Sequence, residues 1–195
     1  MKLQFIYSPA YDRMLMSLMG QTYDWRKEAK AKSFIKKFEK EWVKEEKGIT
    51  KEIEKVSGLK FRKNIDCFVI EDMGYVALSN PLTIKVHKST RQVKNNLIHE
   101  LIHIVLTQNK KSIKLIRILN ESYPKKDPFY KTHLALFIIE RKVMDNLYGK
   151  NYFERAIKED EEVEDMQELR EEFNRLYPHF KKGIIDFFER GIIRK

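Results

Sequence analysis

The sequence predicts an α+β fold that is mainly helical, with a small antiparallel sheet of about three strands and a helical C-terminal extension. Three observations lead to this prediction. Residues 25–57 carry apolar side chains at helical spacing, residues 65–87 contain short β-prone runs, and residues 89–148 contain helix start and stop signals. At 195 residues the chain can form one core of ordinary size with an appended segment.

Residues 25–57 predict one long helix. Their apolar residues recur every three or four positions and would form one buried stripe. The stripe consists of Phe34, Ile35, Phe38, Trp42, Ile49, Ile53 and Val56. Gly58 marks the expected end, because glycine closes many helices in a left-handed conformation. Gly48 is expected to bend or divide the helix, since glycine weakens a helix interior.

Short β-prone runs follow this helix. Ile65–Ile70 and Tyr75–Leu78 are rich in residues that favour strands. Leu82–His87 alternates in polarity, and Pro81 at its start is typical of an edge strand. An exposed edge there would allow an extended peptide to pair with the sheet. Leu3–Tyr7 is a candidate for a further strand.

Capping signals then predict a helix and a shorter one after it. Ser89 is a suitable N-cap, and Gln92 three residues later completes a capping box. The helix that opens there is expected to run to about Gln108. Ser112–Ser122 has the pattern of a shorter helix.

The next helix has signals at both of its ends. Asp127 is the expected N-cap, Pro128 occupies the first helical position, and the helix runs to about Tyr148, just before a glycine. Residues 151–195 are expected to form two helices separated at Pro178.

The predicted helix from Ser89 contains the segment His99-Glu100-Leu101-Ile102-His103. His99 and His103 are four residues apart, so both imidazoles share one helix face and can reach a single metal ion. Glu100 lies beside them and can take a proton from a zinc-bound water and pass it to a leaving amine. The flanking residues are aliphatic, where unpartnered polar groups would be costly. This pattern predicts a zinc metallopeptidase that hydrolyses peptide bonds.

Such a zinc site requires a third protein ligand and leaves the fourth position to water. The predicted helix Asp127–Tyr148 is the best source. His133 and Glu140 are seven residues apart there and share one apolar face. Glu121, which follows the metal helix at a suitable distance, is a third candidate. Spacing leaves the choice among the three open.

The order of a long helix, a small sheet, the metal helix and a second ligand-bearing helix resembles that of the gluzincin metallopeptidases. More narrowly it resembles the minigluzincins, which are minimal members of that group from thermophilic prokaryotes. The matching residues are Asn96–Ile104 and Lys131–Leu136. The family usually has a histidine in the second segment as third ligand, so the resemblance implies that His133 completes the metal site.

The resemblance covers roughly residues 25–148 and has one departure within its motifs. The family often has a second histidine where this chain has Phe137. The resemblance implies a zincin-like catalytic domain over residues 1–148. Residues 149–195 would then be a helical, charged extension.

The charge of the chain permits a different hypothesis. The net charge is +10, and it divides into +12 for residues 1–148 and −2 for residues 149–195. Clustered lysine and arginine displace counterions from nucleic acid. The alternative function is therefore a basic, zinc-stabilised helical protein that binds nucleic acid and has no peptidase activity. The sequence contains no recognised nucleic-acid-binding motif to support it.

The C-terminal extension contains a strongly acidic stretch. Residues 159–172 hold nine acidic side chains and one basic side chain. They follow a region of opposite charge, so one hypothesis is that the extension covers the cleft and keeps the enzyme latent. A second is that it forms a homodimer through its helices. A solvated amphipathic helix is the third.

Composition also suggests where the protein acts. The only cysteine, Cys67, excludes an internal disulfide and favours a reducing, cytoplasmic setting. The longest apolar run, Leu134–Ile139, is too short to cross a membrane. The abundance of lysine, glutamate and isoleucine with few glycines and prolines is typical of a heat-adapted protein.

Overall fold

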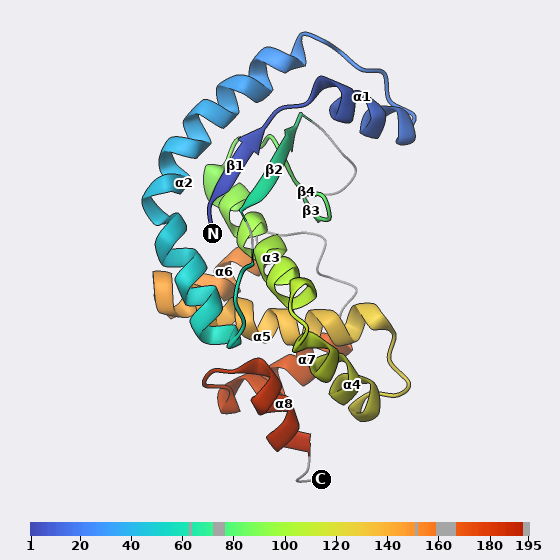
Figure 1. The fold of residues 1–195 in the computed structure, drawn as a ribbon, viewed down its shortest axis with the longest axis vertical. Coiled ribbons are helices and arrows are strands. Elements are labelled where there is room, and N and C mark those ends of the chain that lie inside the picture. Colours follow the sequence, from blue (N-terminus) through green and yellow to red (C-terminus); the bar gives the residue numbers. More distant parts are fainter. Residues whose placement is uncertain (63, 72–76, 151, 159–166, 193–195) are drawn as a thin grey trace. The chain divides into compact units, whose positions relative to one another are not determined.

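The computed structural model describes residues 1–62, 64–71, 77–150, 152–158 and 167–192 (Figure 1). The elements in chain order are β1 (Leu3–Ile6), α1 (Pro9–Leu18), α2 (Lys27–Ser57), β2 (Ile65–Ile70), β3 (Ala77–Ser79), β4 (Leu82–Lys85), α3 (Thr90–Gln108), α4 (Ser112–Ser122), α5 (Pro128–Tyr148), α6 (Tyr152–Lys158), α7 (Gln167–Leu176), the 3-10 helix η2 (Tyr177–His179) and α8 (Ile184–Ile192). The predicted class, a mainly helical α+β fold with a small sheet, is confirmed.

The chain divides into two compact units. The sheet unit comprises residues 1–47 and 62–104, and the helical unit comprises residues 48–61 and 105–195. Two of the three boundaries fall inside the helices α2 and α3, and the third, between Phe61 and Arg62, lies between α2 and β2. The predicted division into a catalytic domain, residues 1–148, and an extension, residues 149–195, stays a prediction.

The sheet has four strands in the order β1-β2-β4-β3 (Figure 1). Neighbours β1 and β2 are parallel, as are β2 and β4, while β3 and β4 are antiparallel. The sheet is therefore mixed, and the prediction that it is antiparallel is wrong except for β3 and β4. The candidate strand at Leu3–Tyr7 is confirmed as β1. Residues 75 and 76, the first two of the predicted strand Tyr75–Leu78, lie outside the described residues.

The prediction that Leu82–His87 is an edge strand is wrong. Strand β4 pairs with β2 on one side and with β3 on the other. Pro81 precedes the first residue of β4, so its missing N–H removes no hydrogen bond from the ladder. Leu82, Thr83 and Ile84 are almost fully buried, as expected of an interior strand.

The core of the sheet unit is aromatic. Phe38 and Trp42 of α2 are each 1% exposed, and both pack edge-on against Phe5 of β1 with ring centroids 5.4 and 6.4 Å away. These residues belong to the apolar stripe that predicted the helix. Burying such large rings contributes several kcal/mol, on the order of 25 cal/mol per Å² of apolar surface.

Gly48, inside α2, and Gly58, directly after it, behave differently. Gly48 does not divide the helix, which runs unbroken from Lys27 to Ser57. A glycine inside a helix costs only about 1 kcal/mol, and the neighbouring Ile49 and Ile53 are fully buried, which offsets it. Gly58 ends the helix as predicted, with a positive φ of 74° that other residues rarely adopt.

Helix α1 was not predicted from the sequence. It begins with Ser8, whose Oγ accepts a hydrogen bond from the Tyr11 N–H at 3.3 Å, and Pro9 occupies the first helical position. The pair Ser8-Pro9 is a recognisable start signal. The helix is short and follows a strand directly, so the apolar periodicity that identifies longer helices is weak here.

The helical unit has a core built around α5. Every residue from Leu134 to Glu140 is buried. The predicted ends of α5 are confirmed, because Asp127 Oδ1 accepts from the Tyr130 N–H at 2.7 Å and Gly149 has a φ of 89°.

The C-terminal residues form α6, α7, η2 and α8 in place of the two predicted helices. Pro178 lies in η2, between α7 and α8, as expected. Residues 159–166, which form most of the acidic stretch, lie outside the described residues. Within the described part of the chain, the helices are all too short or too polar to span a bilayer.

Candidate metal centre

The helix that carries the metal motif begins as predicted. Ser89 Oγ accepts a hydrogen bond from the Gln92 N–H at 3.3 Å. The Ser89 N–H donates to His87 Nδ1 at 3.1 Å, where a capping box would use the Gln92 side chain. Leu97, Ile98 and Leu101 of α3 are fully buried. Capping and burial together fix the part of α3 that contains the motif.

His99 and His103 lie side by side on α3. Their ring centroids are 5.0 Å apart and their ring planes are inclined by 69°. Both side chains are half-buried, so an ion bound to them would be only partly exposed to solvent. Glu100, the next residue after His99, is buried at 9% exposure. A buried carboxylate that follows a candidate metal ligand in the sequence is typical of a functional site.

The structure brings His133 of α5 to the histidine pair. One ring nitrogen each of His99, His103 and His133 lies within 4.8 Å of the others. The three histidines are therefore close enough to bind one metal ion. The group contains neither of the two other ligand candidates. Glu121 is 70% exposed and faces Arg117 at 3.9 Å, and Glu140 is 6% exposed within the core around α5.

His133 is oriented by its own helix. Its Nδ1 lies 2.9 Å from the carbonyl oxygen of Phe129, one turn earlier. A carbonyl oxygen only accepts hydrogen bonds, so this contact requires the proton on Nδ1 and leaves the lone pair of the neutral ring on Nε2. The ring also stacks on Phe129 at 3.8 Å and meets Phe137 edge-on at 5.8 Å. Metal-binding histidines usually donate their second N–H in this way.

The donor set fits a divalent transition-metal ion. Three neutral imidazoles suit zinc, copper, iron or nickel, whereas calcium and magnesium prefer oxygen ligands. Nitrogen ligands of a tetrahedral zinc ion lie roughly 3.4 Å apart, given Zn–N bonds of about 2.0–2.1 Å. The observed separations of at most 4.8 Å approach this value.

Sequence reasoning did not identify Phe129 as part of the site. Its carbonyl group and its ring both contact His133. Residues four apart on a helix are neighbours, so the spacing between Phe129 and His133 was a usable signal. It gained meaning only once His133 was placed in the ligand group.

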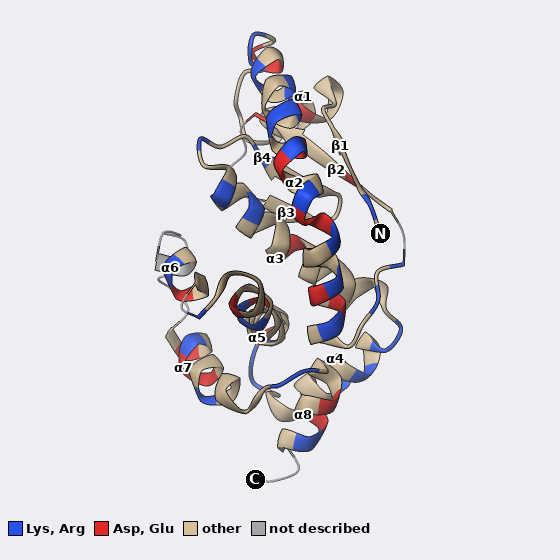
Figure 2. Ribbon diagram, turned by 90° about the vertical axis from the view of Figure 1, so that its left-hand side faces the viewer, with Lys and Arg blue, Asp and Glu red and all other residues tan. Residues whose placement is uncertain are grey.

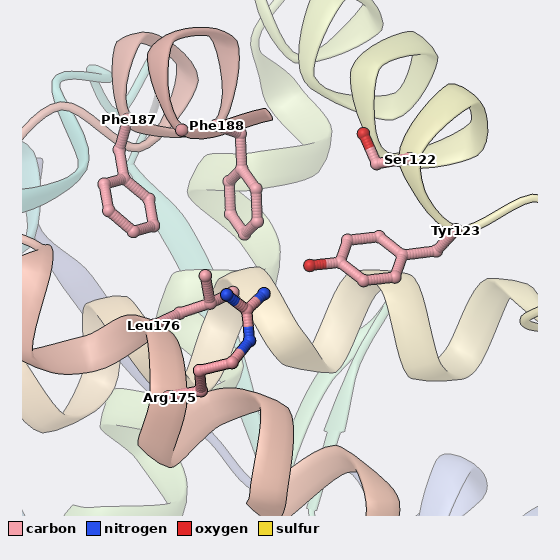
Figure 3. Close-up of a pocket in the computed structure, with 7 residues that line it drawn as sticks. Ser122, Tyr123, Arg175, Leu176, Phe187 and Phe188 are labelled. Carbon is pink, nitrogen blue, oxygen red and sulfur yellow. The ribbon is translucent and has the colours of Figure 1, made fainter. Parts of the chain in front are cut away.

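A cavity elsewhere in the helical unit is not part of this site. It is lined by Ser122, Tyr123, Arg175, Leu176, Phe187, Phe188 and Gly191. The guanidinium of Arg175 and the hydroxyl of Tyr123 point toward the same space (Figure 3). Both bind Glu172, with the Tyr123 hydroxyl donating at 2.5 Å and Arg175 donating twice at 2.6 and 2.7 Å. At about 60 Å³ the cavity is too small for a peptide.

Basic and acidic residues alternate along the ribbon of α2 (Figure 2). Lys32 pairs with Glu28 at 2.5 Å, and Lys55 pairs with Glu52 at 3.1 Å on the same helix. Such pairs within one helix neutralise part of the positive charge. This helix therefore does not present the uniform basic face that nucleic-acid binding favours. Nucleic-acid binding stays a prediction.

Comparison of the chain with protein-family models, with curated proteins and with solved structures gives no match. The resemblance to the minigluzincins thus depends on the motif residues of α3 and α5, and it stays a prediction. The proximity of the three histidines is a separate observation that does not depend on that resemblance.

Proposed function

We propose that the protein is a zinc-dependent metallopeptidase of the minigluzincin type. One observation carries the proposal: His133 lies with the histidine pair of the His-Glu-x-x-His segment, and the buried Glu100 is next to that pair. A metal site of three histidines with an adjacent carboxylate supports hydrolysis by an activated water.

His99, His103 and His133 would hold the ion. The hydrogen bond from His133 Nδ1 to Phe129 supports this role, because it presents Nε2 as the ligand atom. When bound, zinc supplies Lewis-acid chemistry: it polarises a peptide carbonyl and makes water a stronger nucleophile at neutral pH.

Glu100 would carry the proton. Glu100 lies between His99 and His103 in the sequence of α3, and it is not a member of the ligand group. Its carboxylate can accept a proton from the attacking water and then donate that proton to the leaving amine. Burial at 9% exposure keeps bulk water from competing for the proton.

The substrate would be a peptide or protein, and the setting would be the cytoplasm. Cys67 supports a reducing compartment, because it is the only cysteine and is fully buried. Burial raises the pKa of its thiol, so the sulfur is kept in its unreactive form.

The test is the substitution Glu100→Gln, with Glu140→Gln as the matched control. Glu140 is also a buried acid, at 6% exposure, but it lies outside the ligand group. We expect Glu100→Gln to keep its zinc, measured by plasma mass spectrometry, while kcat/KM on a peptide library falls by roughly 10²–10⁴-fold. Glu140→Gln should keep both its zinc and its kcat/KM. Unchanged cleavage by Glu100→Gln would contradict the mechanism, and absence of cleavage by the zinc-loaded unmodified chain would contradict the function.

A further inference from the structure

A larger cavity lies wholly within the helical unit, where the end of α2 meets the starts of α4 and α8. Its volume of about 340 Å³ falls within the range of small-molecule sites. Helices α4 and α8 pack against each other (Figure 1), and the Gly183 N–H donates to the Val56 carbonyl oxygen at 2.8 Å. The residues that line the cavity are Ser57, Gly58, Lys111, Lys114, Gly183, Ile185 and Asp186.

Two glycines leave room in this cavity. Gly58 and Gly183 both have a φ of 74°, which residues with a side chain rarely adopt. A Cβ added to Gly58 would lie only 3.3 Å from the Cα of Gly183. The two backbones approach this closely because neither carries a side chain, and the hydrogen bond from Gly183 to Val56 holds them together. The shape of the cavity is therefore set by the fold before any ligand binds.

The cavity is bordered by two charged side chains that have no partner. Lys114 is compensated, because its Nζ lies 2.7 Å from Glu189. In the described part of the chain, by contrast, the side chains of Lys111 and Asp186 form no ion pair, either with each other or with another residue. Asp186 Oδ2 lies 3.7 Å from the position that a Cβ of Gly183 would take, so this carboxylate faces the space left by that glycine. One positive and one negative charge thus border the same space.

Ser57 adds a neutral hydrogen-bond donor. It is only 1% exposed, and its Oγ accepts a hydrogen bond from the Leu59 N–H at 3.1 Å. Among the described residues none accepts a hydrogen bond from the Ser57 hydroxyl. A hydroxyl can accept and donate at the same time, so its hydrogen is left for a ligand.

We propose that this cavity binds a zwitterionic ligand, either a free amino acid or a short peptide with unblocked ends. Its carboxylate would bind Lys111 and the Ser57 hydroxyl, and its ammonium group would bind Asp186. A simple anion such as phosphate fits less well, because the two unpaired charges of the lining cancel. The cavity shares no residue with the histidine group, and the inference does not rest on the proposed function.

The experiment is a titration of the isotope-labelled full chain by nuclear magnetic resonance. The amide signals of Gly58 and Gly183, which line the cavity, report binding. The probes are alanine, trialanine, N-acetyl-trialanine, trialanine amide and inorganic phosphate. All chains carry Glu100→Gln, so that the proposed peptidase activity does not consume a probe.

We expect alanine or trialanine to shift both glycine signals, with a dissociation constant in the millimolar range. Lys111 and Asp186 are exposed, and exposed ion pairs contribute little affinity. N-acetyl-trialanine lacks the ammonium group and trialanine amide lacks the carboxylate, so each should bind about fivefold more weakly than trialanine. Tighter binding of alanine than of trialanine would assign the site to free amino acids, and the reverse would assign it to peptides.

Substitutions of the two unpaired charges then test each contact. Asp186→Asn should weaken trialanine binding about fivefold and should bind the N-acetyl compound as well as trialanine. Lys111→Gln should show the same loss and should no longer distinguish trialanine from its amide. Lys110→Gln and Glu121→Gln are the matched controls, because both residues are exposed in the same unit and do not line the cavity. Both should bind like the unmodified chain.

Three results would overturn the inference. The first is that neither alanine nor trialanine shifts the signals of Gly58 and Gly183. The second is equal binding of trialanine and its two blocked derivatives, or discrimination that persists in both Asp186→Asn and Lys111→Gln. The third is tighter binding of phosphate than of either zwitterion, which would make the cavity a simple anion site.

Discussion

The two helices that supply the histidines hold them in different ways. On α3, His99 and His103 are one helical turn apart, so the 5.0 Å between their rings follows from helix geometry. On α5, His133 is oriented by two neighbours. The carbonyl oxygen of Phe129 accepts a hydrogen bond from His133 Nδ1, and the Phe129 ring stacks on the imidazole. The ring of Phe137 packs against the imidazole edge-on. Both arrangements use neighbours one helical turn away, but Phe137 also packs against Phe153 of α6 and Phe173 of α7, so the surroundings of His133 depend on tertiary packing as well.

This difference indicates where the metal centre is sensitive to change. Phe137 is the link, because it contacts His133 on one side and the rings of Phe153 and Phe173 on the other, each at 6.4 Å. Changes in that aromatic cluster should therefore reach the metal through His133. The pair on α3 should be insensitive to them.

The largest effect is expected from removing a ligand on either helix. We expect His103→Ala and His133→Ala each to weaken zinc binding by more than about a hundredfold, since loss of an outer partner alone costs about 10–100-fold. Competition with a zinc chelator measures the affinity. Equal losses would show that the helix-determined ligand and the packing-determined ligand contribute alike.

The controls for this prediction are the two other candidates for third ligand. Glu140→Gln and Glu121→Gln should leave zinc affinity within about threefold of the unmodified chain, because neither belongs to the histidine group. Strong loss of zinc in Glu140→Gln together with full retention in His133→Ala would transfer the role to Glu140.

Much of the fold could be predicted because its signals are local. Strand β2 and helices α4 and α5 have the predicted bounds, since β-prone residues and capping groups such as Asp127 act within a few positions. Strand pairing could not be predicted. Whether β1 and β4 run parallel to β2 depends on how the chain returns to the sheet, which the alternation along one strand does not encode.

The metal site, too, could be predicted only where its residues are close in the sequence. His99, Glu100 and His103 could be identified from one helical turn. Spacing left His133, Glu140 and Glu121 equivalent, because the third ligand lies on another helix and tertiary packing decides which side chain reaches the pair. Phe129 was missed because its role depends on that choice.

The next effect in size tests whether the aromatic cluster supports His133. Phe173 of α7 is 5% exposed and packs against Phe153 at 5.8 Å. We expect Phe173→Ala to lower the free energy of unfolding by about 3–5 kcal/mol, measured by urea denaturation. Zinc affinity of the folded fraction should also fall, by up to about tenfold, because Phe137 loses a neighbour.

An exposed apolar residue of the same unit provides the control. Ile116 is 58% exposed, so Ile116→Ala should change the free energy of unfolding by at most about 0.5 kcal/mol and leave zinc binding unchanged. If Phe173→Ala destabilised the protein without changing zinc affinity, packing would not be what orients His133.

The same cluster bears on the latency hypothesis. If residues 149–195 inhibit the enzyme, their removal should raise activity. However, Phe153, Phe173 and Phe188 are buried. Their removal would expose a large apolar surface, so we expect truncation after residue 148 to unfold the helical unit and abolish activity. Raised activity in a folded truncated protein would instead support latency.

The smallest effect concerns acid stability of the sheet unit. Glu71 is 7% exposed and pairs with Lys27 at 2.9 Å and Lys30 at 2.5 Å. Burial raises the pKa of Glu71, but the hydrogen bonds from Lys30 and Lys27 outweigh burial and hold its pKa below the ordinary value. The contribution of the Glu71 carboxylate to the free energy of unfolding is therefore present above the unfolded-state pKa of about 4.3. It is lost as the pH falls through the lower folded-state pKa. Since the side chains of Lys27 and Lys30 are 36% and 63% exposed, we expect Glu71 to contribute about 1 kcal/mol or less to the free energy of unfolding.

Urea denaturation in the presence of a chelator, at ~pH 6 and at ~pH 3, measures this contribution without interference from zinc. Glu71→Gln should flatten the acid-induced loss of stability between these values. With zinc present, a separate loss of stability should occur at a higher pH than the loss due to Glu71, because imidazole ligands must be neutral to hold the metal. Because Glu71 does not belong to the ligand group, Glu71→Gln should leave that higher step unchanged. A shift of the higher step in this variant would mean that the ion pair of the sheet unit influences the histidine pair on α3, which would then depend on more than its own helix.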